Sequence, residues 1–144
     1  MKLLVLNGPN LNMLGIREKE LYGTQTYDDL RDYIRKKAQA LGLDVEIFQS
    51  NSEGALVDRI QAAYGVMDGI IINPAAYTHT SVAILDALKA VGLPAAEVHL
   101  TDIAKREPFR RISYAGMACQ AHFIGLGFDG YGKALEWMKD TLNP

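Results

Sequence analysis

Short apolar runs alternate along this chain with stretches in which apolar residues recur every three or four positions. The clearest run is Ile70–Ile72, three β-branched residues that suit a strand buried on both faces. A polar segment, Asn73–Ser81, follows it directly. Apolar positions then return at helical spacing over Val82–Leu88 and stop at Gly92. This pattern predicts a buried strand, a polar turn and a helix in immediate succession.

The same pattern of strand and helix continues along the rest of the chain. Strands are predicted at 3–6, 45–48, 70–72, 95–100 and 119–124, and helices at 27–41, 56–64, 82–91 and 128–142. Such alternation favours a parallel sheet with right-handed crossovers and helices on both faces. We therefore expect an α/β fold, a flavodoxin-like doubly wound sandwich with a five-stranded parallel sheet, formed by residues 1–144 as a single domain.

Polar segments follow the first, third and fourth predicted strands. They begin at Asn7, Asn73 and Thr101, and the first continues into a long connection that we expect to act as a lid loop over about residues 8–23. Because the carboxyl ends of parallel strands meet at one edge of a sheet, these segments should converge there. The sequence thus predicts a small-molecule site at that edge.

Composition and charge narrow the classes of partner. With 49% hydrophobic and 22% charged residues, the 144-residue chain is typical of globular proteins, and its net charge of -2 argues against a nucleic-acid partner. The first apolar run is too short for a signal peptide, and no run approaches the roughly 20 residues that span a membrane. A single cysteine permits no intrachain disulfide. A cytoplasmic protein without membrane attachment is expected.

The common nucleotide, metal and hydrolase motifs are not found where they would act. Neither GxGxxG nor GxxxxGK[ST] follows the first strand, so no nucleotide cofactor is expected, and the absence of HExxH and CxxC gives no reason to expect a metal. GxSxG is absent as well. His122 and Cys119, both inside the predicted fifth strand, are interpreted as a packed histidine and a buried inert thiol.

Acid–base chemistry on a small anion remains. Tyrosine has an unperturbed pKa near 10, so Tyr22 is a weak base by itself. A guanidinium such as that of Arg17, in the same loop, favours the phenolate and lowers this pKa. The alternative is that Tyr22 anchors the loop and Arg17 is solvated. Glu97 and His99 lie two residues apart on one face of a strand, where the carboxylate can orient the imidazole and support its cationic form. An exposed ion pair is the alternative there.

Blocks of sequence spread over nearly the whole chain point to a known family. In order, they are LNGPNLNMLGIRE with ELYG, QSNSEG, INPAAYTHTSVAI, EVHLTDI, RE-x-FR and GLGFDGY. In identity, order and spacing they resemble the type II 3-dehydroquinate dehydratases. The resemblance implies a flavodoxin-like lyase that needs no metal, cofactor or Schiff base and serves the shikimate pathway or quinate catabolism.

The resemblance also implies a role for each candidate residue. Tyr22 would remove the proton α to the ketone of 3-dehydroquinate, with Arg17 holding it as phenolate. Asn10 would stabilise the enolate. His99, oriented by Glu97, would protonate the leaving hydroxyl to give 3-dehydroshikimate. The substrate would be bound by Asn73, His79, Leu100, Thr101 and Arg110, and by Asp86 of a neighbouring subunit in a dodecamer built of trimers.

Two departures from the family pattern lie close to the predicted site. Ala75 stands where the family usually has glycine, and Asp102 stands where it usually has asparagine, which adds a negative charge near the expected carboxylate site. These departures motivate a second hypothesis, a non-catalytic module that binds small anions on the same fold. A lyase that forms an imine through Lys105 is a third.

Overall fold

The computed structural model describes residues 1–16 and 24–143, so Arg17, Tyr22 and the second half of the expected lid loop lie outside the described residues. Five strands form one parallel sheet in the order β2-β1-β3-β4-β5. The strands are β1 (Lys2–Asn7), β2 (Asp44–Gln49), β3 (Gly69–Asn73), β4 (Ala95–His99) and β5 (Ala121–Ile124). This order and its crossovers confirm the flavodoxin-like prediction.

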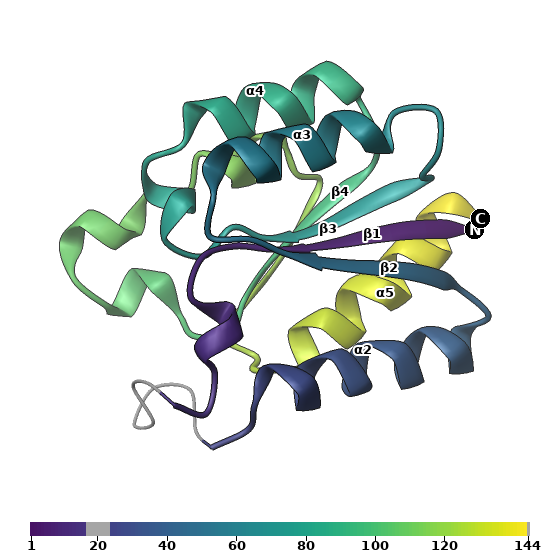
Figure 1. The fold of residues 1–144 in the computed structure, drawn as a ribbon, viewed down its shortest axis with the longest axis horizontal. Helices are drawn as coiled ribbons and strands as arrows, with labels where there is room; N and C mark the ends of the chain where they lie inside the picture. The colour runs from purple at the N-terminus through teal and green to yellow at the C-terminus, as the bar shows by residue number, and fades with distance from the viewer. Residues whose placement is uncertain (17–23, 144) are drawn as a thin grey trace.

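Within the part of the chain that the structure describes, four α-helices cover the two faces of the sheet (Figure 1). On one face lie α3 (Glu53–Ala63) and α4 (Val82–Val91), and on the other lie α2 (Tyr27–Leu41) and α5 (Asp129–Leu142). Alternate residues of β1 and β3 therefore enter two separate cores. In β3, Ile71 packs on the α2 and α5 side, whereas Ile70 and Ile72 pack on the α3 and α4 side. Each such side chain stabilises the fold by about 1.5–3 kcal/mol on burial.

Local sequence sets where the helices begin and end. The Thr26 hydroxyl accepts a hydrogen bond from the Asp29 N–H, and the Asp29 carboxylate accepts one from the Thr26 N–H, which closes a capping box at the start of α2. At the start of α4, the buried Ser81 hydroxyl accepts from the Ile84 N–H. Gly92 ends that helix with a φ of 64°. The polar segment after β3 is thus held between a strand end and a capped helix.

The fifth strand begins two residues later than predicted. Cys119 ends a short 3₁₀ helix, Ala115–Ala118, and its N–H donates to the Gly116 carbonyl. That N–H is therefore not available to the sheet. The Gln120 N–H instead donates to the Ala95 carbonyl and starts the pairing with β4. Hydrogen bonding in the preceding turn, rather than apolarity, decides where β5 begins.

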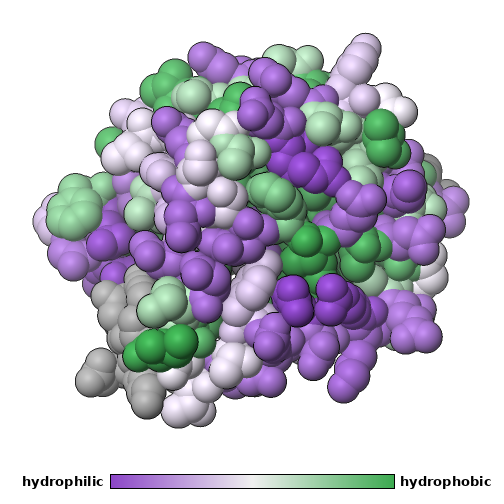
Figure 2. All heavy atoms as spheres, in the orientation of Figure 1, coloured by the Kyte–Doolittle hydropathy of each residue, from purple (hydrophilic) through white to green (hydrophobic). Residues whose placement is uncertain are grey.

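The surface of the molecule is mixed in character. Figure 2 shows hydrophilic side chains over most of one face, with hydrophobic atoms gathered between them. The edge strand β2 is only partly buried, with Ile47 and Phe48 at intermediate exposure. Within 1–16 and 24–143, no helix combines the length and apolarity that crossing a membrane requires.

Candidate active site

A pocket of about 140 Å³ opens at the carboxyl ends of β1, β3 and β4, at the edge of the sheet that the sequence indicated. Seven predicted site residues line it: Asn10, Asn73, His79, His99, Leu100, Thr101 and Arg110. Six further lining residues were not predicted: Pro9, Leu11, Ala75, Ala76, Ile103 and Arg106. The convergence of three polar segments, inferred from strand order, is confirmed.

Backbone hydrogen bonds tie the first loop to its neighbours. The Gly8 N–H donates to the Asn73 carbonyl at 2.8 Å, so the ends of β1 and β3 stay paired beyond the sheet. Asn10 has a φ of 69°, a left-handed conformation that asparagine tolerates better than most residues. Its N–H donates to the Asn51 side-chain oxygen at 3.0 Å. Asn10 therefore enters the pocket from a defined turn.

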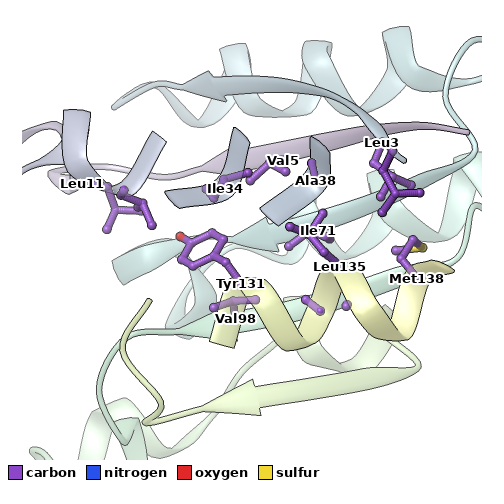
Figure 3. Close-up of a cluster of buried hydrophobic side chains, with 14 of the residues drawn as sticks. Leu3, Val5, Leu11, Ile34, Ala38, Ile71, Val98, Tyr131, Leu135 and Met138 are labelled. Atoms are coloured by element: carbon purple, nitrogen blue, oxygen red, sulfur yellow. The ribbon is translucent and has the colours of Figure 1, made fainter. Parts of the chain in front are cut away.

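A buried network of hydrogen bonds holds the Asn73 amide in place. Its oxygen accepts from the Ala75 N–H at 3.1 Å, and its nitrogen donates to the Tyr131 hydroxyl at 2.9 Å. Tyr131 in turn donates to the Asn7 side-chain oxygen at 2.7 Å. Figure 3 shows the Tyr131 ring within the hydrophobic core, with its hydroxyl toward Leu11. Burial raises the pKa of Tyr131, which keeps the phenol neutral.

Glu97 and His99 form a buried pair behind the pocket. Their side chains are 3% and 5% exposed, and His99 Nε2 lies 2.9 Å from Glu97 Oε2. Burial alone would raise the pKa of Glu97, but hydrogen bonds from His99 and Ser113 outweigh it and lower the pKa to about 2. An ionised carboxylate can only accept, so His99 Nε2 donates and Nδ1 remains for a ligand. The alternative of an exposed ion pair is wrong.

His79 presents its second ring nitrogen as an acceptor. Its Nδ1 lies 2.8 Å from the Ile112 carbonyl, which can only accept, so Nδ1 carries the hydrogen. Burial lowers the pKa of His79, and the positive charge of Arg110 acts in the same direction. The ring is therefore neutral near pH 7. Its Nε2 can accept a hydrogen bond from a hydroxyl group in the pocket.

Two arginines from one segment line the same pocket. Arg110 Nε lies 2.6 Å from Glu107 Oε2, and its guanidinium lies 5.1 Å from the centre of the Phe109 ring. Arg106, four residues earlier, belongs to the polar segment that begins at Thr101 and was not among the predicted site residues. Two guanidinium groups at one small pocket favour an anionic ligand.

The two residues of the segment 101–111 that raised other hypotheses do not line the pocket. The Asp102 carboxylate accepts from the Ala104 N–H at 3.0 Å and caps the short 3₁₀ helix Ile103–Lys105. Lys105 is 84% exposed, with its Nζ 4.0 Å from Asp102. Among the lining residues that the structure describes there is no lysine, so an imine through Lys105 has no structural support.

Other predicted residues lie elsewhere. Asp86 is exposed on α4 and does not line the pocket of its own chain. Cys119 is partly buried, and burial raises its pKa to about 12, in agreement with an inert thiol. His122 is exposed rather than packed, which corrects the interpretation from sequence. Within the described ranges, no three His, Cys, Asp or Glu side chains are arranged to hold a metal ion.

Comparison with known proteins gives consistent results. The model of the family described as dehydroquinase class II matches residues 1–139. A 3-dehydroquinate dehydratase of Clostridium acetobutylicum is 49% identical over 143 residues, 99% of each chain. One of Geotalea daltonii is 57% identical over 131 residues, 91% of each chain. The crystal structure of type II dehydroquinase from Butyrivibrio crossotus has a TM-score of 0.94 at 47% identity, covering 96% of this chain and 97% of that one.

Proposed function

Because the chain belongs to the dehydroquinase class II family, we propose that its pocket removes water from 3-dehydroquinate, a carbon–oxygen lyase reaction that gives 3-dehydroshikimate. The observation that carries this proposal is the pocket itself. It brings an imidazole backed by a buried carboxylate together with two guanidinium groups and two amides. Those groups suit a hydroxylated carboxylic acid that loses a hydroxyl group.

The base in this proposal is Tyr22. Its phenolate takes the proton α to the ketone, and Arg17 holds the phenolate because a nearby guanidinium favours the charged form of a phenol. Both residues belong to the loop 8–23, which we propose as a lid, and both lie outside the described residues. The described part of that loop supplies Asn10 to the pocket. Asn10 stabilises the enolate that forms.

The acid in this proposal is His99. Its Nδ1 carries the proton that leaves with the substrate hydroxyl as water, while Nε2 stays bonded to Glu97. The buried carboxylate holds the ring in place and offsets its positive charge. The reaction balances: one proton goes to Tyr22, and one from His99 leaves with the hydroxyl group.

The remaining lining residues bind the substrate. His79, neutral with a free Nε2, accepts from a substrate hydroxyl, and Asn73 holds another polar group. Arg110 pairs with the carboxylate, next to Leu100 and Thr101. We also propose, on the family resemblance, that Asp86 completes the pocket of a neighbouring subunit in a dodecamer built of trimers.

Following the ultraviolet absorbance of the conjugated product after adding 3-dehydroquinate tests the function directly. Tyr22→Phe should lower kcat about 10²- to 10⁴-fold while the variant still binds substrate. Tyr64→Phe, an exposed tyrosine after α3, is the matched control and should leave kcat unchanged. Absence of any absorbance rise near neutral pH would contradict the proposal. Thermal stabilisation by substrate without product would instead support a non-catalytic anion-binding module.

A further inference from the structure

A second histidine binds the carboxylate that orients His99. His122 lies on β5 directly opposite Glu97 in the parallel register, and its Nδ1 is 2.5 Å from Glu97 Oε1. His99 binds the other carboxylate oxygen, Oε2. The His122 side chain is 44% exposed, whereas those of Glu97 and His99 are almost fully buried. One carboxylate therefore joins an imidazole at the pocket to an imidazole at the surface.

The Glu97 carboxylate has little freedom to move between the two rings. The Ser113 hydroxyl donates to Oε2 at 2.6 Å, and Ser113 is itself held by the Gly116 N–H at 3.1 Å. A Cβ atom at Gly116 would meet Oε1, so the backbone lies close against the carboxylate. A change in charge at either imidazole must therefore alter the electrostatic potential at the other, because the carboxylate cannot rotate away from one of them.

We propose that His122 is a positioning residue for His99 and acts through the shared Glu97 carboxylate. When His122 is neutral, its N–H holds the carboxylate, whose full charge supports the His99 imidazolium. When His122 takes up a proton, its positive charge competes for that carboxylate, and His99 holds its own proton less firmly. This inference rests on the proposed role of His99 as the acid. If the inference holds, the protonation of the exposed His122 changes how readily His99 donates its proton.

The titratable and charged groups next to this arrangement come from several of the described elements. From β4 come Glu97 and His99, and from the end of the 3₁₀ helix Ala115–Ala118 comes Cys119, which stays neutral because burial and Glu97 raise its pKa to about 12. The opposite face of β5 packs on the core beneath α5 through Ala121 and Phe123. On the pocket side, electrostatic interactions link His79 with His99 and with the two arginines that line the pocket, Arg106 and Arg110.

Two substitutions separate the charge of His122 from its hydrogen bond. His122→Gln keeps an N–H donor for Glu97 but cannot become charged, and His122→Leu removes both. The side chain is half exposed on an edge strand, so both variants should fold, which a thermal melt checks. If charge is what matters, both variants should shift the titration of His99 in the same direction. The loss of the N–H donor to Glu97 should add a further change to the His99 titration, and only in His122→Leu.

The primary measurement is NMR titration of the imidazole resonances in the free protein. The pH dependence of the His99 resonances in His122→Gln should differ from that in the unaltered protein, because a charged His122 no longer competes for the Glu97 carboxylate. The limb of the kcat profile that follows ionisation of His99 should be displaced as well, with KM changed less than about twofold.

An unchanged His99 titration in His122→Gln would overturn the inference, and so would a fall in kcat at all pH values without displacement of the limb. The NMR measurement needs no substrate. If the titration shifts but 3-dehydroquinate is not converted, the coupling between the histidines stands and the proposed function fails.

Discussion

Ala75 holds a backbone conformation that favours glycine. Its φ is 53°, in the left-handed region, where the Cβ atom of an L-residue crowds the following carbonyl. The residue follows Pro74 at the end of β3 and lines the pocket, and its N–H donates to the Asn73 side chain. The hydrogen bond and the capped helix that follows hold the strained turn in place. Glycine, the residue expected here from the family resemblance, adopts this conformation without strain.

Replacing Ala75 by glycine should therefore stabilise the protein. Relief of the left-handed strain exceeds the entropy lost by the glycine, and we expect a gain of about 1 kcal/mol in the free energy of unfolding, measured in urea. Ala76→Gly is the matched control, because Ala76 has no positive φ and should lose about 0.5–1 kcal/mol. Equal effects of the two substitutions would show that the strain at Ala75 is not significant.

The ionisation of Glu97 makes the free energy of unfolding depend on pH. Its pKa in the folded protein, about 2, is below the ordinary value of 4.5. A lowered pKa stabilises the fold above the unfolded-state value, and that stabilisation is lost as pH falls from about 4.5 towards 2. The difference in free energy of unfolding between the unaltered protein and Glu97→Gln should shrink by about 2 kcal/mol between about pH 6 and pH 3. A difference that stays constant across this range would contradict the prediction.

The ends of β1 and β3 touch where the pocket begins. A Cβ atom at Gly8 would lie 2.3 Å from the Pro74 carbonyl oxygen, closer than any real contact. Both atoms belong to backbone, so neither can move aside without separating the two strand ends. A glycine at residue 8 is therefore required by the close approach of two elements, and the Gly8 N–H bond to Asn73 depends on it.

Gly8→Ala should destabilise the protein by more than about 2 kcal/mol, since separating packed backbone costs at least as much as overpacking a core. Gly54→Ala is the control. Gly54 lies in α3, where a Cβ atom would meet nothing nearer than the Ser52 hydroxyl at 3.9 Å, and alanine there should stabilise the helix by up to about 1 kcal/mol. Urea unfolding of both variants tests the contrast. A neutral Gly8→Ala would show that the strand ends can separate freely.

The elements themselves were largely predictable, because capping residues and apolar periodicity act within a few positions of the chain. Helix α2 spans Tyr27–Leu41, the predicted range, between the Thr26 cap and Gly42. The start of β5 was predicted wrongly, since Cys119 is apolar and only the hydrogen bond to Gly116 removes it from the strand. Competition for one N–H is not visible in a pattern of hydrophobicity.

Assembly is a prediction that follows from the family and from the position of Asp86. This residue is exposed on α4 and does not line the pocket of its own chain. Sedimentation analysis should find a dodecamer. Asp86→Asn should raise KM about tenfold without changing the particle mass, because a charged hydrogen bond contributed by a neighbour is weakened. An active monomer that is insensitive to Asp86→Asn would contradict both the assembly and the role of Asp86.

The order of strands and helices, the position of the site at one sheet edge and the relationship to the family can all be inferred from the sequence. Each depends on local periodicity or on contiguous blocks, so no contact between distant residues has to be known. The candidate residues Asn73, His79, His99 and Arg110 were found in this way, and the pocket contains all four.

The environment of those residues depends on contacts between distant parts of the chain. Glu97 and His99 could be recognised as a pair, but whether the pair was buried could not. His122 lies 25 residues from Glu97 in sequence and Ser113 lies 16, and both reach the carboxylate only because β5 and the turn before it pack against β4. Burial and hydrogen-bond geometry set the ionisation of Glu97, and both arise only when these segments come together.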